Sequence, residues 1–486
     1  MIYKLRPYQE ECVKSISDYI NSDRHDPVLI VGPVGCGKSL LIAEAARLMG
    51  DKTLILQPSK ELLQQNHDKI TSYGIPATIY SASCGKKELS NMIYATLGSI
   101  KKVVDKLKEM GIRNVLIDEA HAGYSPEDGS EFMTFMNELK PKKVIGFTAT
   151  PCRLKNMSIG QTSYSQLNFI TRMRPVYFKN LIHVIQVEEM IRQGFWTPLK
   201  YETWDFNGDA LKLNSNGSEY TAGSISEAVR KNGLNNLILR RLMVLKDVCR
   251  SILVFMDSVE SCNTAAEWMN AKICAGMAEV VHGGTPKKQR EAIVERFKSG
   301  GTRVVFNYSA LGTGFDHPGL DCVIVGRPTF SFSSFYQWLG RAVRIKDGKD
   351  SALVVDCCNN SSRFGDIRKL SIENYKGYGW GMFIGDKLIT NIPMGDKVTK
   401  TDLDIKAAKK DRRRGLAQGV TAAPVPGRPD HPLGSTVMTF GKYCGWMLHS
   451  IPVSYFKFIN ETFDWDNDRN KDIKEYIDFL IKNNRL

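Results

Sequence analysis

A glycine-rich run carries the most specific chemistry in this sequence. Gly32-Pro-Val-Gly-Cys-Gly-Lys38-Ser39 matches the spacing GxxxxGK[ST] in full, between an apolar stretch and a helix-like stretch. Glycines let backbone N–H groups close around phosphate oxygens, and the amino end of the following helix adds a favourable field. Lys38 can reach the β- and γ-phosphates, and the Ser39 hydroxyl can ligate Mg²⁺. We therefore expect ATP and Mg²⁺ at a site formed by Gly32, Pro33, Gly35, Cys36, Gly37, Lys38 and Ser39.

Two adjacent carboxylates follow another apolar stretch. Val115–Ile117 precedes Asp118 and Glu119, and His121 comes two residues later. Asp118 can hold Mg²⁺ through its waters, and Glu119 can polarise the attacking water. An acidic strand end is common by itself, but beside the glycine-rich run it predicts a site of nucleotide hydrolysis.

A later cluster supplies two arginines. Arg341 and Arg344 follow Gln337, and their spacing predicts one shared face of a helix. Across a cleft between two domains, planar guanidinium groups can stabilise a departing γ-phosphate, so hydrolysis would depend on domain closure. A basic helix face that meets solvent or DNA is the alternative. Upstream, Gly314 offers a flexible turn, and Asp316 offers a carboxylate suited to a ribose hydroxyl or a coupling contact.

The elements that must position these residues follow from the pattern of apolar runs. Two series of short apolar runs alternate with helix-like stretches, which predicts an α/β fold with two tandem parallel-sheet domains. The first series of expected strands is Val28–Val31, Thr53–Gln57, Ala77–Tyr80, Ile93–Thr96, Val115–Ile117 and Val144–Phe147. The second series is Ile252–Phe255, Glu279–Val281, Thr302–Phe306, Cys322–Val325 and Ala352–Val355. Expected helices include Ser39–Met49, Lys60–Ile70 and Val187–Gln193.

This pattern predicts five parts of the chain. They are a first ATP-binding domain at 1–155, a connector subdomain without a sheet of its own at 156–240, a second domain at 241–360, an extension and basic Pro/Gly-rich linker at 361–432, and a small C-terminal α+β module at 433–486. The linker contains the run Lys409-Lys-Asp-Arg-Arg-Arg414. This run either attracts a polyanion without specificity or is a solvated, localisation-like tract.

Composition indicates the kind of partner and compartment. The 66 basic and 52 acidic side chains give a net charge of +14, which favours a polyanionic partner such as nucleic acid. The eleven cysteines form no CxxC pair, so a zinc ribbon is not expected, and their spacing suits reduced thiols. Because no apolar run has the length of a membrane span and the first residues lack a signal-peptide core, we expect a protein of the bacterial or infected-host cytoplasm.

These motifs, in this order, resemble those of superfamily 2 helicases and translocases of the DEAH-box type, and Asp118-Glu-Ala-His121 spells that box. The resemblance covers roughly 1–360 and implies two RecA-like domains and a DNA-stimulated ATP hydrolase. Leu5–Gln9 resembles the family's adenine-reading segment, which implies that Arg6 and Gln9 help to bind the ATP base. Other segments of this sequence resemble the remaining motifs of the family. They are Gln57–Leu62, Ala95–Ile100, Thr148–Thr150, Val254–Ser258, Asn307–Asp316 and Gln337–Arg344.

Within the superfamily, the sequence is similar to RadD-type repair ATPases and related phage helicases. Thr148–Arg153 and Gln193–Pro198 support this likeness. RadD-type proteins carry a cysteine-rich zinc region that this chain lacks, and UvsW-type helicases carry a domain before the motor for which Gly32 comes too early. The end of the chain resembles a small uncharacterised module of the form F-G-K-[YH]-x-G. There, a tight hairpin and a helix after Pro452 are expected, with possible DNA contacts from Lys442, Tyr443 and Trp446, or simply aromatic side chains in a small core.

The resemblance implies sequence-independent contacts with a nucleic acid strand through backbone amides and hydroxyls. These contacts are expected from Pro58, Ser59, Thr96, Gly98, Ser99, Ser258, Ser309 and Thr313. The predicted function is an ATP-dependent DNA helicase or translocase, acting as a monomer, that remodels forked or branched DNA in replication, recombination or repair. An RNA helicase and an ATP-gated loading protein without processive motion remain alternatives.

Overall fold

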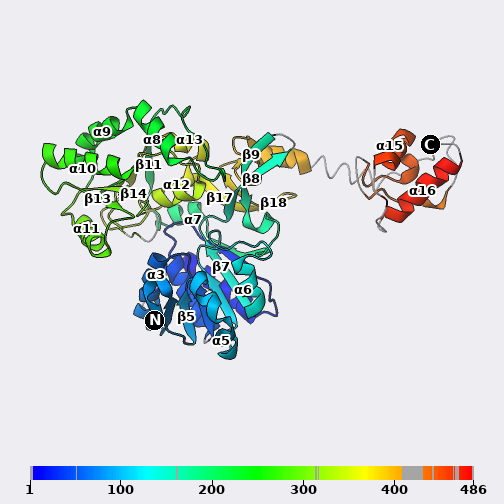
Figure 1. Ribbon diagram of the computed structural model, residues 1–486, viewed down its shortest axis with the longest axis horizontal. Helices are drawn as coiled ribbons and strands as arrows, with labels where there is room; N and C mark the ends of the chain where they lie inside the picture. Colours follow the sequence, from blue (N-terminus) through cyan, green and yellow to red (C-terminus); the bar gives the residue numbers. More distant parts are fainter. Residues whose placement is uncertain are drawn as a thin grey trace. The chain divides into compact units, whose positions relative to one another are not determined.

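The computed structural model of the protein describes residues 4–50, 52–159, 162–311, 315, 317–407, 431–439, 443–462, 465 and 470–483. The chain forms two compact units (Figure 1). The first contains Met1–Tyr375 and Gly379–Thr399, and the second contains Lys376–Tyr378 and Lys400–Leu486. Among the described residues, no helix combines the length and apolar character needed to cross a membrane.

The first sheet of the larger unit has eight strands in the order β10-β1-β7-β6-β2-β5-β3-β4. In the described chain every pair is parallel except β3 with β4. The central strands are buried along their length, as in a parallel sheet with both faces covered. The strands are β1 (Val28–Val31), β2 (Thr53–Leu56), β3 (Thr78–Ser81), β4 (Lys86–Lys87), β5 (Met92–Ala95), β6 (Asn114–Ile117), β7 (Lys143–Thr148) and β10 (Asn180–Val184).

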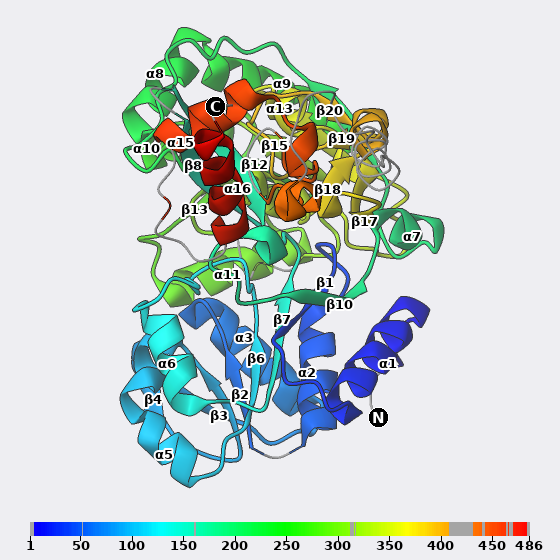
Figure 2. The ribbon, with the colours of Figure 1, turned by 90° about the vertical axis from the view of Figure 1, so that its right-hand side faces the viewer.

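Helices cover both faces of this first sheet. Figure 2 shows α1 and α2 on one side of the strands and α6 on the other. Helices α1 to α3 pack in sequence against one another, and α6 packs against α4 and α5. Their bounds are α1 (Pro7–Asn21), α2 (Lys38–Met49), α3 (Lys60–Ser72), α4 (Leu97–Ile100), α5 (Val104–Glu109) and α6 (Glu131–Leu139).

The second sheet has six parallel strands in the order β11-β16-β15-β12-β14-β13. They are β11 (Leu199–Thr203), β12 (Ile252–Phe255), β13 (Ala278–His282), β14 (Val304–Tyr308), β15 (Cys322–Val325) and β16 (Ala352–Asp356). The helices are α8 (Ala222–Lys231), α9 (Leu234–Val248), α10 (Val259–Lys272), α11 (Lys287–Ser299) and α12 (Phe332–Leu339). Helix α9 packs against α8 and α10, and Figure 1 shows α11 and α12 on the other side of the strands. Two parallel sheets with helical layers confirm the predicted α/β fold class.

The segment between the two sheets contributes to both of them, which the sequence did not reveal. Strand β10 pairs with β1 at the edge of the first sheet, and β11 pairs with β16 at the edge of the second. The expectation that this segment has no sheet of its own is wrong, because β8 (Cys152–Ile159) and β9 (Thr162–Phe169) form a separate antiparallel ribbon. Helix α7 (Val187–Arg192) lies between β10 and β11 in the chain. Strands β10 and β11 are only partly buried, so neither shows the apolar run of a central strand. The predicted domain boundaries themselves stay predictions.

After β16 the chain forms a short helix and a small antiparallel sheet, which the apolar pattern did not predict. Helix α13 (Asn360–Phe364) is followed by an antiparallel sheet in the order β17-β18-β19-β20. Its strands are β17 (Leu370–Tyr375), β18 (Gly379–Ile384), β19 (Lys387–Leu388) and β20 (Val398–Thr399).

The second unit has a core of its own. Helix α15 (Val453–Thr462) begins directly after Pro452, as predicted, and α16 (Lys471–Lys482) packs against it. Val437 and Met447 form an isolated antiparallel bridge. Lys442 and the basic run Lys409–Arg414 lie outside the described residues. The buried apolar side chains that these elements enclose include Met438, Leu448, Ile451, Phe456, Ile459, Ile473, Tyr476, Ile477 and Leu480.

Candidate functional site

The glycine-rich run forms the turn between β1 and α2. Gly35 and Gly37 have φ values of +84° and +85°, in the left-handed region. A Cβ atom on Gly37 would lie 2.5 Å from Nε2 of Gln9, so a larger residue here would be both strained and crowded. Helix α2 begins at Lys38, and its amino end therefore faces the space that the turn encloses.

Asp118 and Glu119 follow β6 and lie beside this turn. Nζ of Lys38 is 2.6 Å from Oε1 of Glu119. On the other side, Nδ1 of His121 is 3.3 Å from Oε2 of Glu119 and 2.9 Å from Oγ1 of Thr148. Glu119 has a φ of +47°, a strained conformation that costs on the order of 1–3 kcal/mol and that the surrounding structure must hold in place.

The charged groups at this site change one another's pKa values. Burial raises the pKa of Asp118 to about 6, although the Lys38 ammonium opposes this effect. Burial acts in the same direction on Glu119, but the Lys38 ammonium and the contact with His121 together outweigh it, and the pKa of Glu119 lies below its usual value. Burial acts to lower the pKa of Lys38, but attraction to Glu119 and Asp118 together raises this pKa above its usual value. Glu119 is therefore ionised at neutral pH, as a general base must be.

Asn66 is a site residue that the motif analysis missed. The Ser39 hydroxyl donates a hydrogen bond to Oδ1 of Asn66 at 2.7 Å. Nδ2 of Asn66 donates to Oδ2 of Asp118 at 3.0 Å and to Oε1 of Gln57 at 3.1 Å. Asn66 shares the buried side of α3 with apolar residues, and a polar side chain in that stripe was the available signal.

The oxygen atoms around Asn66 fit an Mg²⁺ ion. The Ser39 hydroxyl and the Asp118 carboxylate are both hydrogen-bonded to the side-chain amide of Asn66, so they lie close to each other. Mg²⁺ prefers hard oxygen ligands and keeps several waters when it binds through one or two carboxylates and phosphates. Ser39 and Asp118 therefore stay the expected Mg²⁺ ligands.

Arg6 and Gln9 lie at the start of α1, beside the phosphate-binding turn. Gln9 accepts a hydrogen bond from the backbone N–H of Arg6 at 3.0 Å and donates to the Cys36 carbonyl at 2.9 Å. The guanidinium of Arg6 lies over the ring of Phe195, 4.7 Å from its centroid. Both predicted adenine-site residues therefore line the site, and their role in base recognition stays a prediction.

Two adjoining cavities bring most of the predicted residues together. The larger has a volume of about 390 Å³ and extends from Arg6 and Gln9 over the turn to Arg344. The smaller has a volume of about 120 Å³ and is lined from the first sheet by Lys38, Ser39, Asn66 and Glu119 and from the second by Gln337, Gly340, Arg341 and Arg344. The expected cleft between two sheets is thus present.

The predicted helical face for the arginines is wrong. Helix α12 ends at Leu339, and Arg341 and Arg344 lie in the turn and extended segment that follow. The carbonyl of Arg344 accepts a hydrogen bond from Oγ1 of Thr197. Arg341 donates to the carbonyl of Phe315 at 2.6 Å. Both arginines nevertheless line the smaller cavity.

A second residue that the motifs did not indicate is Ser333 on α12. Its hydroxyl lies 3.2 Å from Nε2 of His121 and 3.2 Å from Oγ1 of Thr150. These contacts join the carboxylate motif of the first sheet directly to a helix of the second.

Five of the residues expected to touch nucleic acid lie just after the carboxyl ends of parallel strands, where binding sites of open α/β sheets form. Pro58 and Ser59 follow β2, Thr96 follows β5, Ser258 follows β12, and Ser309 follows β14. Hydroxyls of this set also cap helices: Oγ of Ser59 accepts from Leu62 N–H and Oγ of Ser258 from Ser261 N–H. Gly98 and Ser99 lie in α4. Thr313, Gly314 and Asp316 lie outside the described residues.

Comparison with known families agrees with this geometry. Residues 2–153 match the family described as the res subunit of type III restriction enzymes. Residues 235–346 match the helicase conserved C-terminal domain. The chain belongs to the superfamily 2 helicases. This confirms the predicted superfamily, whereas ATP hydrolysis and the finer likeness to RadD-type proteins stay predictions.

Curated relatives of this superfamily 2 helicase include a 51.5 kDa protein of a Lactococcus phage, 25% identical over 68% of this chain and 65% of the relative. The putative ATP-dependent helicase IRC3 of Saccharomyces cerevisiae is 24% identical over 57% of this chain and 38% of the relative. The chain thus spans only part of these relatives' length.

Two solved structures share the fold. The DNA-bound type ISP restriction-modification enzyme LlaBIII is 14% identical with a TM-score of 0.53, over 87% of this chain and 30% of that one. A fragment of a putative HsdR subunit of a type I restriction enzyme from Vibrio vulnificus is 18% identical with a TM-score of 0.54, over 74% of this chain and 65% of that one.

Proposed function

We propose that this superfamily 2 helicase is an ATP-driven motor that moves along DNA and unwinds or remodels forked or branched substrates. The smaller cavity carries the proposal, because Lys38 and Glu119 of the first sheet and Arg341 and Arg344 of the second line it together. ATP bound there would contact both sheets at once. Its hydrolysis would then change the contacts between them, and with them the grip on a strand.

In this proposal each side chain has a defined task. Lys38 leaves Glu119 and binds the γ-phosphate, and Glu119 takes a proton from the attacking water. Ser39 and Asp118 hold Mg²⁺, which supplies charge stabilisation for the phosphates. Arg341 and Arg344 neutralise charge on the departing phosphate.

Two substitutions test the ATP site. Lys38→Ala removes the phosphate cation, and Glu119→Gln removes the base while keeping the side-chain shape. Both should abolish phosphate release from ATP, and Glu119→Gln should still bind a fluorescent ATP analogue. Robust turnover by Glu119→Gln would remove this residue from the base role.

DNA as the track is supported by the net charge of +14 and by the row of hydroxyls and helix amino ends at the strand termini. ATP hydrolysis should accelerate when DNA is added. Strand displacement and branch migration on matched fork, Holliday-junction, RNA-hybrid and blunt-duplex substrates would decide between a DNA motor, an RNA helicase and an ATP-gated loading protein. A rate that no polynucleotide changes would contradict the proposal of a nucleic acid track.

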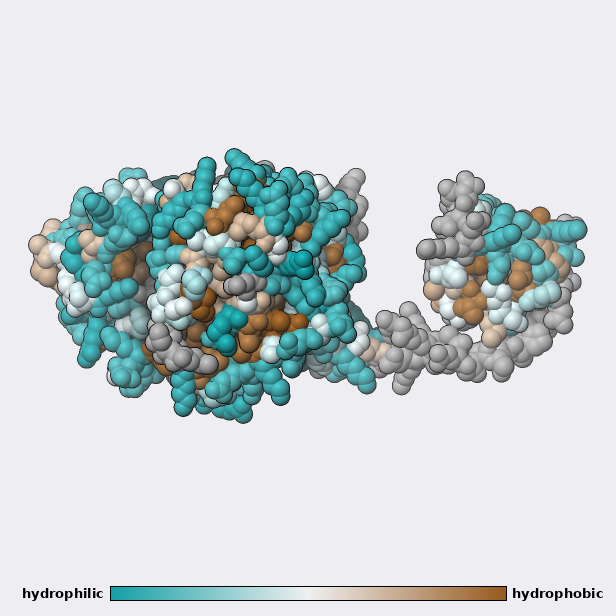
Figure 3. Space-filling model, turned by 90° about the horizontal axis from the view of Figure 1, so that it is seen from below, coloured by the Kyte–Doolittle hydropathy of each residue, from teal (hydrophilic) through white to brown (hydrophobic). Residues whose placement is uncertain are grey.

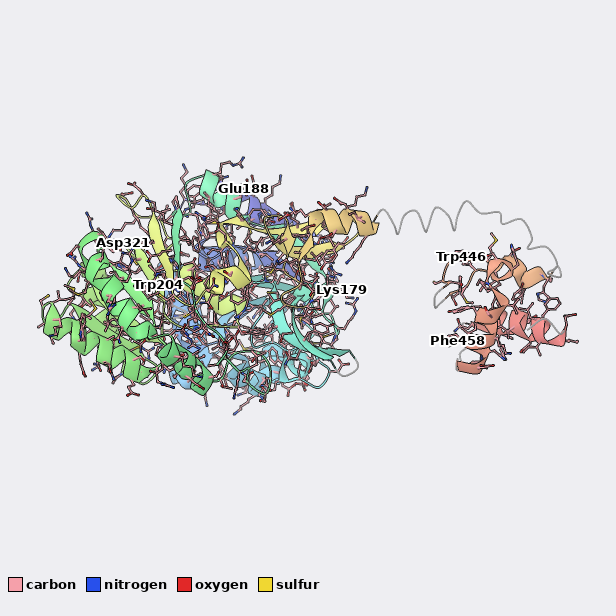
Figure 4. The ribbon with its side chains drawn as sticks, turned by 90° about the horizontal axis from the view of Figure 1, so that it is seen from above. Lys179, Glu188, Trp204, Asp321, Trp446 and Phe458 are labelled. Atoms are coloured by element: carbon pink, nitrogen blue, oxygen red, sulfur yellow. The ribbon has the colours of Figure 1, made fainter. Side chains whose placement is uncertain are left out.

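The C-terminal unit offers a second surface for nucleic acid. Trp446 is 51% exposed and Phe458 is 58% exposed. Tyr443 contacts Trp446 and Tyr455 edge to face, with ring centroids 5.5 Å and 4.8 Å apart, and Tyr455 lies 6.2 Å from Phe458. We call these four residues the aromatic surface. Figure 3 shows apolar side chains exposed on this unit, and Figure 4 shows Trp446 and Phe458 on one side of it. Exposed rings of this kind can stack on unpaired bases.

Monomeric action and a place in the bacterial or infected-host cytoplasm remain part of this proposal. A phage protein among the relatives supports the latter.

A further inference from the structure

The segment 194–198, which we call the linker segment, connects α7 to β11 and passes between the phosphate-binding turn and the arginines. Its central residue, Trp196, is 1% exposed. The indole N–H of Trp196 donates a hydrogen bond to the carbonyl of Val34 at 2.9 Å. Val34 lies within the phosphate-binding turn, so a side chain of the linker segment holds the backbone of that turn directly.

The same part of the turn is packed tightly against the arginine segment. A Cβ atom on Gly340 would lie 2.6 Å from Cβ of Val34, which leaves no space between the two chains. A Cβ atom on Gly35 would lie 3.2 Å from Cγ2 of Val343 and 3.6 Å from the Trp196 ring. Because a packed contact without free volume transmits displacement, a shift of Val34 must also shift Trp196 or Gly340.

The next residue of the linker segment binds the arginine segment. The backbone N–H of Thr197 donates to the carbonyl of Val343 at 2.8 Å. The hydroxyl of Thr197 donates to the carbonyl of Arg344 at 2.7 Å. Lys349 also donates to this carbonyl, at 2.9 Å, so Thr197 supplies one of two side-chain donors that fix the backbone of Arg344.

Phe195 extends the linker segment to the base end of the ATP site. The Arg6 guanidinium lies 4.7 Å above its ring, and Tyr8 packs edge to face against it at 5.4 Å. Three consecutive side chains, Phe195, Trp196 and Thr197, therefore contact the three parts that surround a nucleotide: the base end, the phosphate turn and the arginines.

We propose that Trp196 and Thr197 are positioning residues that transmit movement of the phosphate-binding turn to the backbone of Arg344. The inference rests on the proposed ATP hydrolysis between the two sheets. Phosphate binding draws Lys38 from Glu119 and adjusts the turn. The Val34 carbonyl moves Trp196, and Thr197 then carries Arg344 into its place at the γ-phosphate. The linker segment acts on the rate of hydrolysis through Arg344 and touches no reacting atom.

The experiment separates ATP affinity from turnover in the full chain. Trp196→Phe keeps a ring but deletes the N–H donor, and Thr197→Val keeps the shape but deletes the hydroxyl. Each should lower DNA-stimulated kcat at least about five-fold, the value of one lost hydrogen bond, while Kd for an ATP analogue stays within about two-fold. Thr197→Ser keeps the hydroxyl, so its kcat should stay close to that of wild type.

Two matched controls measure the general cost of such changes. Trp204→Phe deletes an indole N–H that donates to Glu202 at 2.8 Å, and neither residue lines either of the two cavities. Thr302→Val deletes a hydroxyl that donates to Glu279 at 2.5 Å. Both controls should leave kcat and Kd unchanged.

Combination with Arg344→Lys distinguishes positioning from simple structural support. If Trp196 acts through Arg344, Trp196→Phe should cause no further loss of kcat in the Arg344→Lys background, because interacting sites are non-additive. Additive losses, a kcat of Trp196→Phe within about two-fold of wild type, or equal losses in Trp204→Phe would each overturn the proposal. If wild-type hydrolysis does not respond to DNA, the proposed track fails, and the same comparison made on unstimulated kcat still tests the linker segment.

Discussion

Asn66 shows how a neutral side chain can organise a charged site. It accepts a hydrogen bond from Ser39 and donates one to Asp118, so it sets the distance between the two expected Mg²⁺ ligands. It also orients the buried Asp118 carboxylate, whose own pKa is raised by burial. Residues that orient metal ligands through hydrogen bonds typically change metal affinity about 10- to 100-fold when removed.

We therefore expect Asn66→Ala to weaken binding of an ATP analogue in the presence of Mg²⁺ about 10-fold or more, while binding in EDTA is unchanged. Fluorescence titrations under both conditions measure this difference. Gln64→Ala, on the same helix, removes an exposed hydrogen bond to Asp68 and serves as the control. An equal loss with and without Mg²⁺ would show that Asn66 only supports the fold of the turn.

At this scale the sequence revealed the groups that do chemistry but not the groups that place them. Lys38, Glu119 and the two arginines stand in motifs whose spacing reflects phosphate chemistry. Asn66 and Trp196 act through contacts with residues 52 and 162 positions away in the chain, so no local spacing indicates them. The three-residue spacing of Arg341 and Arg344 fits a helix, but α12 ends at Leu339 before it reaches them.

At the scale of elements, the fully buried strands were predictable, whereas the edge strands β10 and β11 were not. Strands β1, β12 and β15 have the bounds that their apolar runs predict, because a strand covered on both faces is apolar throughout. Strand β10 contains Asn180 and His183 and is nowhere fully buried. Its place at the sheet edge depends on pairing with β1, which only the folded chain shows.

Strand β10 gives a prediction on pH. Burial lowers the pKa of His183 below 6.5, and its Nδ1 lies 3.0 Å from Oγ of Ser15 on α1. The unfolded chain takes up this proton as the pH falls through 6.5, and the folded chain does so only at lower pH. The free energy of unfolding should therefore decrease on acidification, because the unfolded state binds more protons.

Urea unfolding of wild type and His183→Gln at about pH 7.5 and about pH 5.5 measures this contribution. The variant should lose less stability than wild type between the two pH values. His25→Gln, at an exposed position before β1, is the control and should behave as wild type does. An identical decrease in all three proteins would assign the acid sensitivity to other groups.

At the scale of the whole molecule, two compact units with separate cores divide the proposed work. The larger unit contains both sheets and the ATP site, and the smaller contains the aromatic surface. The family matches at residues 2–153 and 235–346 both lie within the first of these units, so the second unit depends on physical argument. A motor needs a grip that does not depend on sequence, and exposed rings provide one because every base has a face on which a ring can stack.

The double variant Trp446→Ala with Phe458→Ala should therefore weaken binding to single-stranded or forked DNA at least about five-fold, because stacking contributes about 1–3 kcal/mol per base. Its ATP hydrolysis without DNA should remain that of wild type, since neither ring belongs to the core of the smaller unit. Fluorescence anisotropy at fixed salt measures the affinity. Val248→Ala, which removes an apolar side chain 71% exposed on α9, tests whether any exposed apolar group has this effect. Unchanged DNA affinity in the double variant would contradict the proposal that the aromatic surface contacts nucleic acid. It would favour a docking site for another protein.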